Sequence, residues 1–145
     1  MRWPGPIGLW SRVQGAFRGG GRTPGSSNRV KGDSAEVLAY EFLKKDGYRI
    51  IARKYRRRFG EIDLIGWDRD ILAFVEVKFR SQLEHGRPEE AVNRHKQRQI
   101  CRVAREFRRR HHVQDRCFRY DIVSVLGSQE GPVFRLIKDA FKDTA

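Results

Sequence analysis

The feature that most constrains this chain is a pair of consecutive apolar segments between residues 60 and 80, "GEIDLIGWDRDILAFVEVKFR". Both segments have the length and the β-branched and aromatic content of strands, and a short polar connection at residues 68–70 joins them. Residues 71–75 are apolar at every position, which is typical of a strand covered on both faces. The stretch therefore predicts a β-hairpin in the interior of a sheet.

The charges of this hairpin gather at one end of it. Side chains alternate along a strand, so Glu76 and Lys78 share one face, while Ile62 and Leu64 of the first strand share the face opposite to its acids. A connection of four residues, 68–71, fixes the register between the two strands. It predicts the following opposed pairs: Trp67 with Leu72, Ile65 with Phe74, Asp63 with Glu76, and Glu61 with Lys78.

Two opposed carboxylates in a covered hairpin require a compensating charge. Cβ atoms at directly opposed positions are about 4.5–5.5 Å apart, and like charges placed there are destabilising. Asp63 and Glu76 must therefore share a proton or bind a cation, and Lys78 favours their ionised forms. Oxygen ligands of this kind suit Mg²⁺ or Mn²⁺. The alternative is that Glu76 and Lys78 form an ordinary surface ion pair and that Asp63 is unrelated to them.

The remainder of the chain predicts a basic arm followed by one α/β domain. Residues 1–32 hold eight of the fourteen glycines and six basic residues without an acid, which predicts a disordered arm. Residues 33–145 predict an α/β sandwich with a central mixed β-sheet flanked by helices, in the order α-β-β-β-α-β-β. Around the hairpin, the expected elements are a helix capped by Asp33 or Ser34 and ended by Gly47, a strand over 48–53, a basic turn over 54–60, a helix over 89–110 with Ile100, Val103, Ala104 and Phe107 buried, a strand over 117–126, and a short strand with a C-terminal turn over 132–141.

Composition favours a polyanionic partner and a cytoplasmic location. The net charge of +13 favours a polyanionic partner, nucleic acid first and an acidic membrane second. No apolar run of about 18 residues exists, so no membrane span is expected. Cys101 and Cys117 stand outside any metal-binding spacing and are expected to be free thiols in a reducing compartment.

Arginines and lysines cluster on the helix over 89–110 and just before the hairpin. The charged positions of that helix are nearly all basic, whereas a helix that only faces solvent would mix both signs. We expect these side chains to contact phosphates without reading sequence, although a solvated basic face is the alternative. The candidates are Arg56, Arg57, Arg58, Arg94, Lys96, Arg98 and Arg102.

The spacing Asp63, twelve residues, Glu76-Val77-Lys78 resembles the D…E-x-K signature of the PD-(D/E)XK nuclease superfamily, whose members share the restriction-endonuclease-like fold. More closely, "GEIDLIGWD", "FVEVKFR", "GRPEEAVNRHKQRQI" and "RYDIVSV" are similar to the YraN family of small bacterial proteins, which are relatives of archaeal Holliday-junction resolvases. The resemblance covers about residues 32 to 141.

The resemblance implies roles for individual side chains. Asp63 and Glu76 would bind Mg²⁺ or Mn²⁺ with the backbone carbonyl of Val77, and Lys78 would orient or activate the attacking water. Glu36 matches an acid that related resolvases add from the N-terminal helix, although a solvated acid favoured by the helix dipole is an equal alternative. By strand alternation, Glu61 is expected to support the site through Lys78 or Arg80.

The expected function is therefore metal-dependent hydrolysis of phosphodiesters in structured DNA, with branched junctions among the candidates. Resolvases act as pairs, so a homodimer is an expectation as well. Two alternatives stay open: a non-catalytic nucleic-acid-binding protein that retains the nuclease fold, and a basic module associated with RNA or the ribosome whose acids are structural.

Overall fold

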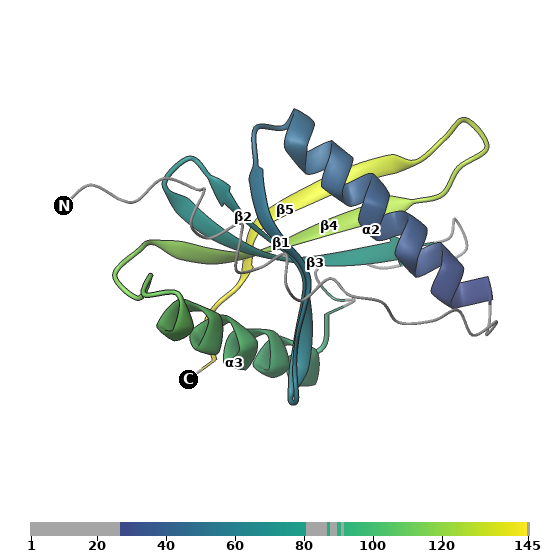
Figure 1. Ribbon diagram of the computed structural model, residues 1–145. Helices are drawn as coiled ribbons and strands as arrows, with labels where there is room; N and C mark the ends of the chain where they lie inside the picture. Colours follow the sequence, from purple (N-terminus) through teal and green to yellow (C-terminus); the bar gives the residue numbers. More distant parts are fainter. Residues whose placement is uncertain (1–26, 81–86, 88–89, 91, 145) are drawn as a thin grey trace.

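The computed structural model describes residues 27–80, 87, 90 and 92–144, and side chains from Ser34 onward. The described residues form an α/β fold in which one mixed sheet lies between two helices, one over each face (Figure 1). Its elements are α2 (Ser27–Lys45), β1 (Arg49–Arg57), β2 (Gly60–Asp68), β3 (Ile71–Arg80), α3 (Arg94–Arg110), β4 (Phe118–Leu126) and β5 (Val133–Phe141).

The sheet has the strand order β1-β2-β3-β4-β5 and is mixed, as predicted. Every neighbouring pair is antiparallel except β3 and β4, which run parallel and are connected through α3. The β2–β3 pairing confirms the predicted register as far as Leu64 and Val75, with Trp67 opposite Leu72 and Ile65 opposite Phe74. The other two predicted pairs, Asp63 with Glu76 and Glu61 with Lys78, are not part of the ladder. The hairpin consequently lies inside the sheet, where β1 and β4 flank it.

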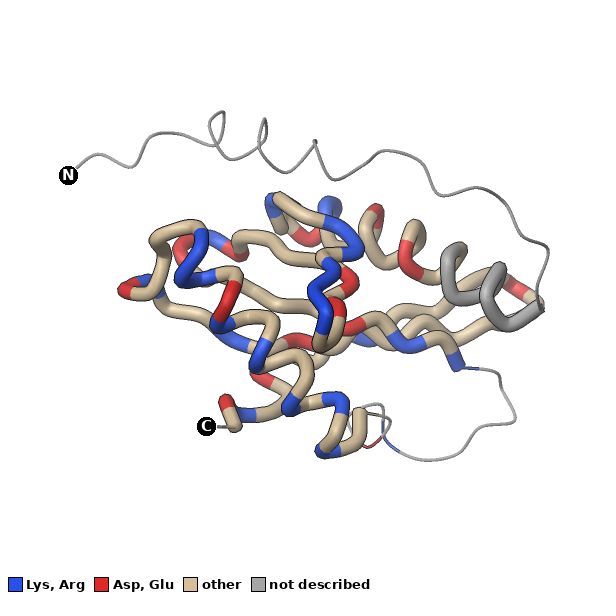
Figure 2. The backbone as a smooth tube through the Cα atoms, turned by 60° about the horizontal axis from the view of Figure 1, so that its bottom comes forward, with Lys and Arg blue, Asp and Glu red and all other residues tan. Residues whose placement is uncertain are grey.

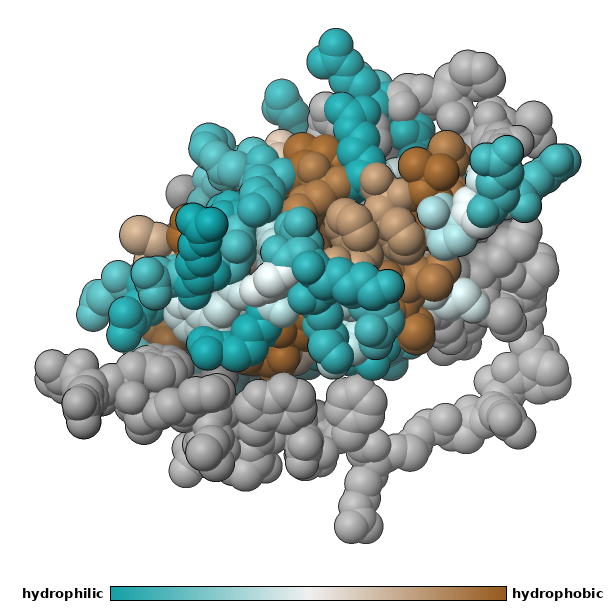
Figure 3. Space-filling view, turned by 90° about the horizontal axis from the view of Figure 1, so that it is seen from above, coloured by the Kyte–Doolittle hydropathy of each residue, from teal (hydrophilic) through white to brown (hydrophobic). Residues whose placement is uncertain are grey.

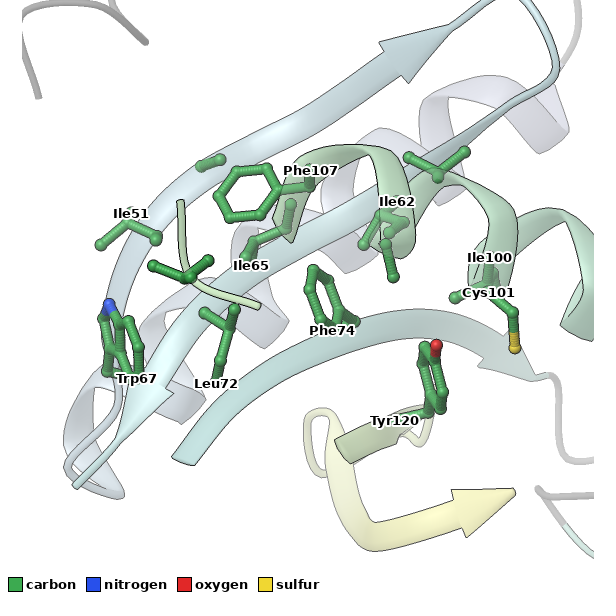
Figure 4. Packing of buried hydrophobic residues seen from close by; sticks show 14 of the residues in the cluster. Ile51, Ile62, Ile65, Trp67, Leu72, Phe74, Ile100, Cys101, Phe107 and Tyr120 are labelled. Atoms are coloured by element: carbon green, nitrogen blue, oxygen red, sulfur yellow. The ribbon is translucent and has the colours of Figure 1, made fainter. Parts of the chain in front are cut away.

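Each face of the sheet has its own apolar core. On the α3 face, the rings of Phe74 and Phe107 meet edge to face at 5.9 Å between centroids (Figure 4). The stripe predicted for this helix is buried there, and the free thiol of Cys101 lies beside it. On the α2 face, a second cluster contains Ala35, Ala39, Leu43, Leu64, Ala73, Val75, Val123 and Val125. The two helices therefore hold the sheet from opposite sides.

The first and last parts of the described chain are more regular than the sequence predicts. Helix α2 begins at Ser27, ahead of the predicted cap at Asp33 or Ser34, so residues 27–32 are helical and not part of a disordered arm as predicted. The remainder of the predicted arm, residues 1–26, lies outside the described residues. Strand β5 continues to Phe141 through the predicted C-terminal turn. That strand is held by pairing with β4, a long-range interaction that local sequence patterns do not reveal.

The basic turn predicted over 54–60 is mostly strand. Strand β1 continues to Arg57 because Tyr55 packs edge-on against Phe107, at 5.1 Å between ring centroids. The hydroxyl of Tyr55 donates a hydrogen bond to Glu106 of α3 at 3.1 Å. Contacts with α3, far along the chain, thus extend a segment whose local sequence looks like a loop.

Helix α3 begins at Arg94, where the side chain of Asn93 accepts a hydrogen bond from the backbone N–H of Lys96 at 2.9 Å. Such a cap satisfies one of the free N–H groups of the first helical turn. The predicted start at residue 89 is too early, because Val92 and Asn93 precede the helix; residues 89 and 91 lie outside the described residues. No helix in the described part of the chain is long and apolar enough to cross a membrane.

Helix α2 leaves one end of its sheet face accessible. Seen from above, the surface shows apolar side chains among polar ones (Figure 3). Phe79 extends the series Val75 and Val77 on the α2 side of β3, yet it is exposed. The end of β3 that carries Glu76 and Lys78 is therefore close to solvent, although the middle of the strand is fully covered.

Gly66 allows the close approach of β1 and β2. A Cβ atom at this position would lie 2.9 Å from both the carbonyl oxygen of Arg49 and Cδ1 of Ile50. We expect Gly66→Ala to lower the free energy of unfolding by about 1–3 kcal/mol, because the backbone of β1 must move. Gly127→Ala is the control, since the nearest atom there belongs to the exposed ring of Phe79. Urea unfolding that gives equal losses for both variants would contradict this packing.

Candidate active site

The pairing of β2 with β3 ends where the acids begin. The regular register runs from Asp68 and Ile71 to Leu64 and Val75 and is not continued at the next residues. There, Oδ2 of Asp63 accepts a hydrogen bond from the backbone N–H of Val77 at 2.7 Å. The Asp63 carboxylate thus takes the place of a main-chain acceptor on β2 and is held directly against β3.

Strand β1 is irregular at the same level of the sheet. Arg53 pairs with Leu64 and Tyr55 with Ile62, but the intervening Lys54 and Asp63 are not paired. Lys54 has a φ of 48°, in the left-handed region that side chains with a Cβ rarely adopt. The backbones of both strands therefore depart from regular pairing beside the acids.

This irregularity corrects one prediction from strand alternation. Ile62 and Leu64 were expected to share a face, but Ile62 lies with Ile65 in the α3 cluster (Figure 4), whereas Leu64 lies in the α2 cluster. Alternation is broken at Asp63, between them. As a result, the Asp63 side chain reaches across to the backbone of β3 while its neighbours contribute to separate cores.

Asp63 and Glu76 are both buried, with 7% and 4% of their surfaces exposed. Burial raises the pKa of Asp63 well above its usual range, and the negative charge of Glu76 raises it further. Glu36 of α2 also raises this pKa, whereas the Val77 N–H and the charge of Lys96 act in the opposite direction. Glu36 of α2 and Glu76 of β3 are thus close enough to Asp63 to raise its pKa.

Two lysines contact the Glu76 carboxylate. Nζ of Lys78 lies 3.2 Å from Oε1, and Nζ of Lys96 lies 3.4 Å from Oε2. Oε2 is buried and accepts no hydrogen bond from the described residues, so its contact with Lys96 is purely ionic. Lys78 therefore contacts the acid that precedes it by two residues, and Lys96, expected only to contact nucleic acid, contacts the same carboxylate.

Glu36 is oriented by an ion pair across the α2 face. Its Oε2 lies 3.4 Å from Nζ of Lys54, and its side chain is 17% exposed. This burial disfavours the alternative in which Glu36 is a solvated acid of the helix. Lys54, whose backbone lies in the left-handed region, is therefore the residue whose ammonium pairs with Glu36.

The expected supporting pairs differ from those observed. Glu61 accepts a hydrogen bond from Nε of Arg56 at 2.7 Å, so it is not paired with Lys78 as predicted. Arg57 is anchored to Glu106 at 2.8 Å, which corrects the expectation that it is available to hold a nucleic-acid backbone. Arg80 ends β3, where it pairs with Leu126 of β4 in the sheet.

Several exposed basic residues lie on α3. Arg94, Arg98 and Arg102 are exposed along this helix, and basic positions recur along its length (Figure 2). The guanidinium of Arg102 lies 4.5 Å from the ring centroid of Phe59, in the β1–β2 turn. Arg58, in the same turn, is exposed as well. The candidate phosphate contacts therefore form one surface of α3 and this turn, which we refer to below as the basic surface.

The metal ligands offered by the described residues are few. They include no group of three or more His, Cys, Asp or Glu side chains placed to hold a metal ion. Two carboxylates, Asp63 and Glu76, are available, together with the carbonyl of Val77. The N–H and C=O of one residue point to the same side of a strand, so this carbonyl faces the side on which Val77 donates to Asp63.

The signals for the unexpected lysines differ. Lys96 precedes Ile100 by four residues and Val103 by seven, which places it on the buried stripe of α3. That spacing was readable from the sequence. For Lys54, no local pattern indicates a left-handed backbone or a partner on α2.

The fold and this cluster define a small α/β protein with buried carboxylates at the end of its central hairpin. Residues 35–125 match the model of the uncharacterised protein family UPF0102. A UPF0102 protein of Symbiobacterium thermophilum is 46% identical over 79% of this chain and 98% of its own length. Another, from Caldicellulosiruptor saccharolyticus, is 41% identical over 79% of this chain and 99% of its own length. The chain belongs to the UPF0102 family, also known as the YraN family, which confirms that part of the resemblance.

The raised pKa of Asp63 predicts a pH-dependent cost to folding. A carboxyl whose pKa is higher in the folded state destabilises that state once the pH exceeds the unfolded value of about 3.9. The resulting decrease in the free energy of unfolding grows with pH until the pH exceeds the pKa of the carboxyl in the folded protein. In a chelating buffer at pH 7, we expect Asp63→Asn to be more stable than the wild type by on the order of 1 kcal/mol, because the amide oxygen can still accept from Val77.

The difference in the free energy of unfolding between Asp63→Asn and the wild type, measured by urea unfolding, should decrease as the pH falls toward 4. Asp70→Asn, at an exposed position, is the control and should follow the wild type. A gap that is independent of pH, or an Asp63→Asn variant that is less stable at pH 7, would contradict the burial of an ionised carboxyl here.

Proposed function

We propose that this protein is a metal-dependent nuclease that hydrolyses phosphodiesters in structured DNA, and that its α/β fold is of the restriction-endonuclease-like type. The observation that carries the proposal is the burial of Asp63 and Glu76 on neighbouring central strands, with Lys78 on the Glu76 carboxylate. The strand order, with α2 before a three-stranded antiparallel unit and α3 connecting parallel strands, supports the fold assignment.

Asp63, Glu76 and the Val77 carbonyl are the groups that would hold Mg²⁺ or Mn²⁺. They fit a hard cation because all three offer oxygen atoms. The pKa of Asp63 is raised by burial and by Glu76, so its ionised form is the one that a nearby positive charge would stabilise. When bound, such an ion polarises a phosphate and lowers the pKa of coordinated water.

Lys78 supplies a fixed positive charge at the open end of the site. In hydrolysis, the oxygen of water bonds to phosphorus, the bond from phosphorus to one ester oxygen breaks, and a proton ends on that leaving oxygen. Negative charge accumulates on the phosphate oxygens in the transition state, and an ammonium close to them lowers the barrier. Lys78 is 31% exposed and remains fixed by Glu76, so it can face both the carboxylate and a substrate.

The basic surface is the proposed binding face for the nucleic-acid backbone. Arg98 and Arg102 lie on the same helix as Lys96, which reaches the acids. A backbone that follows α3 is thereby led toward Glu76. Such contacts position a polyanion without reading its sequence, which suits recognition of a shape rather than a base sequence.

One observation favours a second function, that of a non-catalytic nucleic-acid-binding protein. Glu76 has two lysine partners and Glu36 has Lys54, so ion pairs within the chain already offset much of the acidic charge. A cluster compensated in this way can be structural. The basic surface would then bind DNA, or RNA in the third alternative, without cutting it.

Cleavage assays separate these functions. Purified protein is incubated with junction, flap and linear DNA, and with RNA hairpins, in Mg²⁺, Mn²⁺ or chelator. We expect metal-dependent cutting of structured DNA that falls about 100-fold or more in Asp63→Ala, Glu76→Ala and Lys78→Ala. Glu61→Gln is the matched acidic control, because Glu61 pairs with Arg56 outside the cluster, and its rate should stay within about threefold of the wild type.

The contrary outcomes are distinct. Cutting that survives Asp63→Ala and Glu76→Ala would show that another protein in the sample is responsible. Binding without cutting in either metal would establish the non-catalytic function. Preference for RNA would favour the third alternative and overturn the assignment to DNA.

A further inference from the structure

Lys96 connects the basic surface with the acid cluster. It lies in the first turn of α3, between the exposed Arg94 and Arg98, but its own side chain is only 26% exposed. The side chain turns toward the sheet, where Nζ lies 3.4 Å from Oε2 of Glu76. Among the described residues, no other side chain of α3 forms an ion pair with an acid of this cluster.

The contact between Lys96 and Glu76 leaves the ammonium free to bind a second group. Oε2 accepts no hydrogen bond from the described residues, so the attraction is ionic rather than directional. An ammonium has three N–H donors and no acceptor, and its stem has four carbon atoms that can rotate. Lys96 can therefore turn toward another anion by exchanging this ionic contact for a new one, while Lys78 still contacts Oε1 of Glu76.

A phosphate that approaches Glu76 needs such a cation. Glu76 is 4% exposed and negatively charged, and Asp63 lies beside it, so the acids alone would repel a nucleic-acid backbone. Lys78 contacts Oε1 from the end of β3, and Lys96 contacts Oε2 from α3. The two lysines approach the carboxylate from different elements and contact different oxygen atoms. One of them can therefore stay on Glu76 while the other binds a phosphate.

We propose that Lys96 is a phosphate-binding residue of the active site: Glu76 holds it in the free protein, and it turns to the nucleic-acid phosphate nearest the acids in the complex. This inference rests on the proposed function and adds to it the residue that brings the backbone from α3 to the site of cutting. Lys96 and Glu76 are consequently coupled, because the same ammonium serves the carboxylate and the phosphate.

The coupling gives a test that does not depend on cleavage. The affinity of the full chain for a short junction DNA is measured by fluorescence anisotropy in chelator, over a series of salt concentrations. The variants are Lys96→Ala, Glu76→Gln and the double variant. In the Glu76→Gln background, we expect Lys96→Ala to weaken binding about tenfold and to reduce the slope of log K against log salt by about 0.9, the value for one phosphate contact.

In the protein with native Glu76, Lys96→Ala should weaken DNA binding by a smaller factor. The reason is that Lys96 must give up its contact with the Glu76 carboxylate in order to bind the phosphate. Arg98→Ala is the matched control: it removes an exposed charge of the same helix and should cost the same in both backgrounds. Lys96→Gln replaces Lys96→Ala if urea unfolding shows that the alanine variant is not folded.

An equal or smaller loss from Lys96→Ala in the Glu76→Gln background would overturn the inference, since Lys96 would then be only a structural partner of Glu76. Absence of DNA binding by the wild type would overturn it as well. A wild type that binds but does not cut contradicts the proposed function alone, and the affinity measurements still decide the role of Lys96. If the wild type cuts, Lys96→Ala should also slow cutting at saturating protein.

Discussion

Two carboxyl groups are buried at the point where the β2–β3 ladder ends, and the local structure is organised around them. Burying an ionised carboxylate costs several kcal/mol unless hydrogen bonds or opposite charges compensate for it. Asp63 obtains one hydrogen bond from the Val77 N–H, and Glu76 obtains two ionic contacts, from Lys78 and Lys96. A site that retains such groups in a covered hairpin is stabilised by cations, whether from the chain or from solution.

The charges around the buried carboxyl groups come from both layers of the fold. Helix α2 contributes Glu36, whose negative charge raises the pKa of Asp63, and α3 contributes Lys96, whose positive charge lowers it. Between them, the irregular backbone of Lys54 accompanies the break in alternation at Asp63. The same helices bury the two apolar cores, so packing of the domain and assembly of the cluster occur together. A substitution in either core can therefore disturb the acids without touching them.

Periodicity in the sequence was sufficient to predict the central hairpin, its register from Asp68 to Leu64 and the buried stripe of α3, because those features follow from spacings of two and of three to four residues. It failed where distant partners decide the structure. The strand content of residues 54–57 depends on Glu106 and Phe107, which are remote in sequence. The break at Asp63 could not be predicted either, since it arises from the β1 and β3 backbones together. By contrast, Lys96 had a readable spacing, but its charge suggested a solvent-facing role.

The UPF0102 relatives align with this chain over almost their whole length, so the cluster can be sought in them by direct alignment. The central claim is that the buried acids form a site for a divalent cation. Isothermal titration of Mn²⁺ into the wild type and Asp63→Asn tests it most directly. The account predicts saturable heat of binding at one site in the wild type and its loss in Asp63→Asn. Equal heats in both proteins, or none in the wild type, would contradict it.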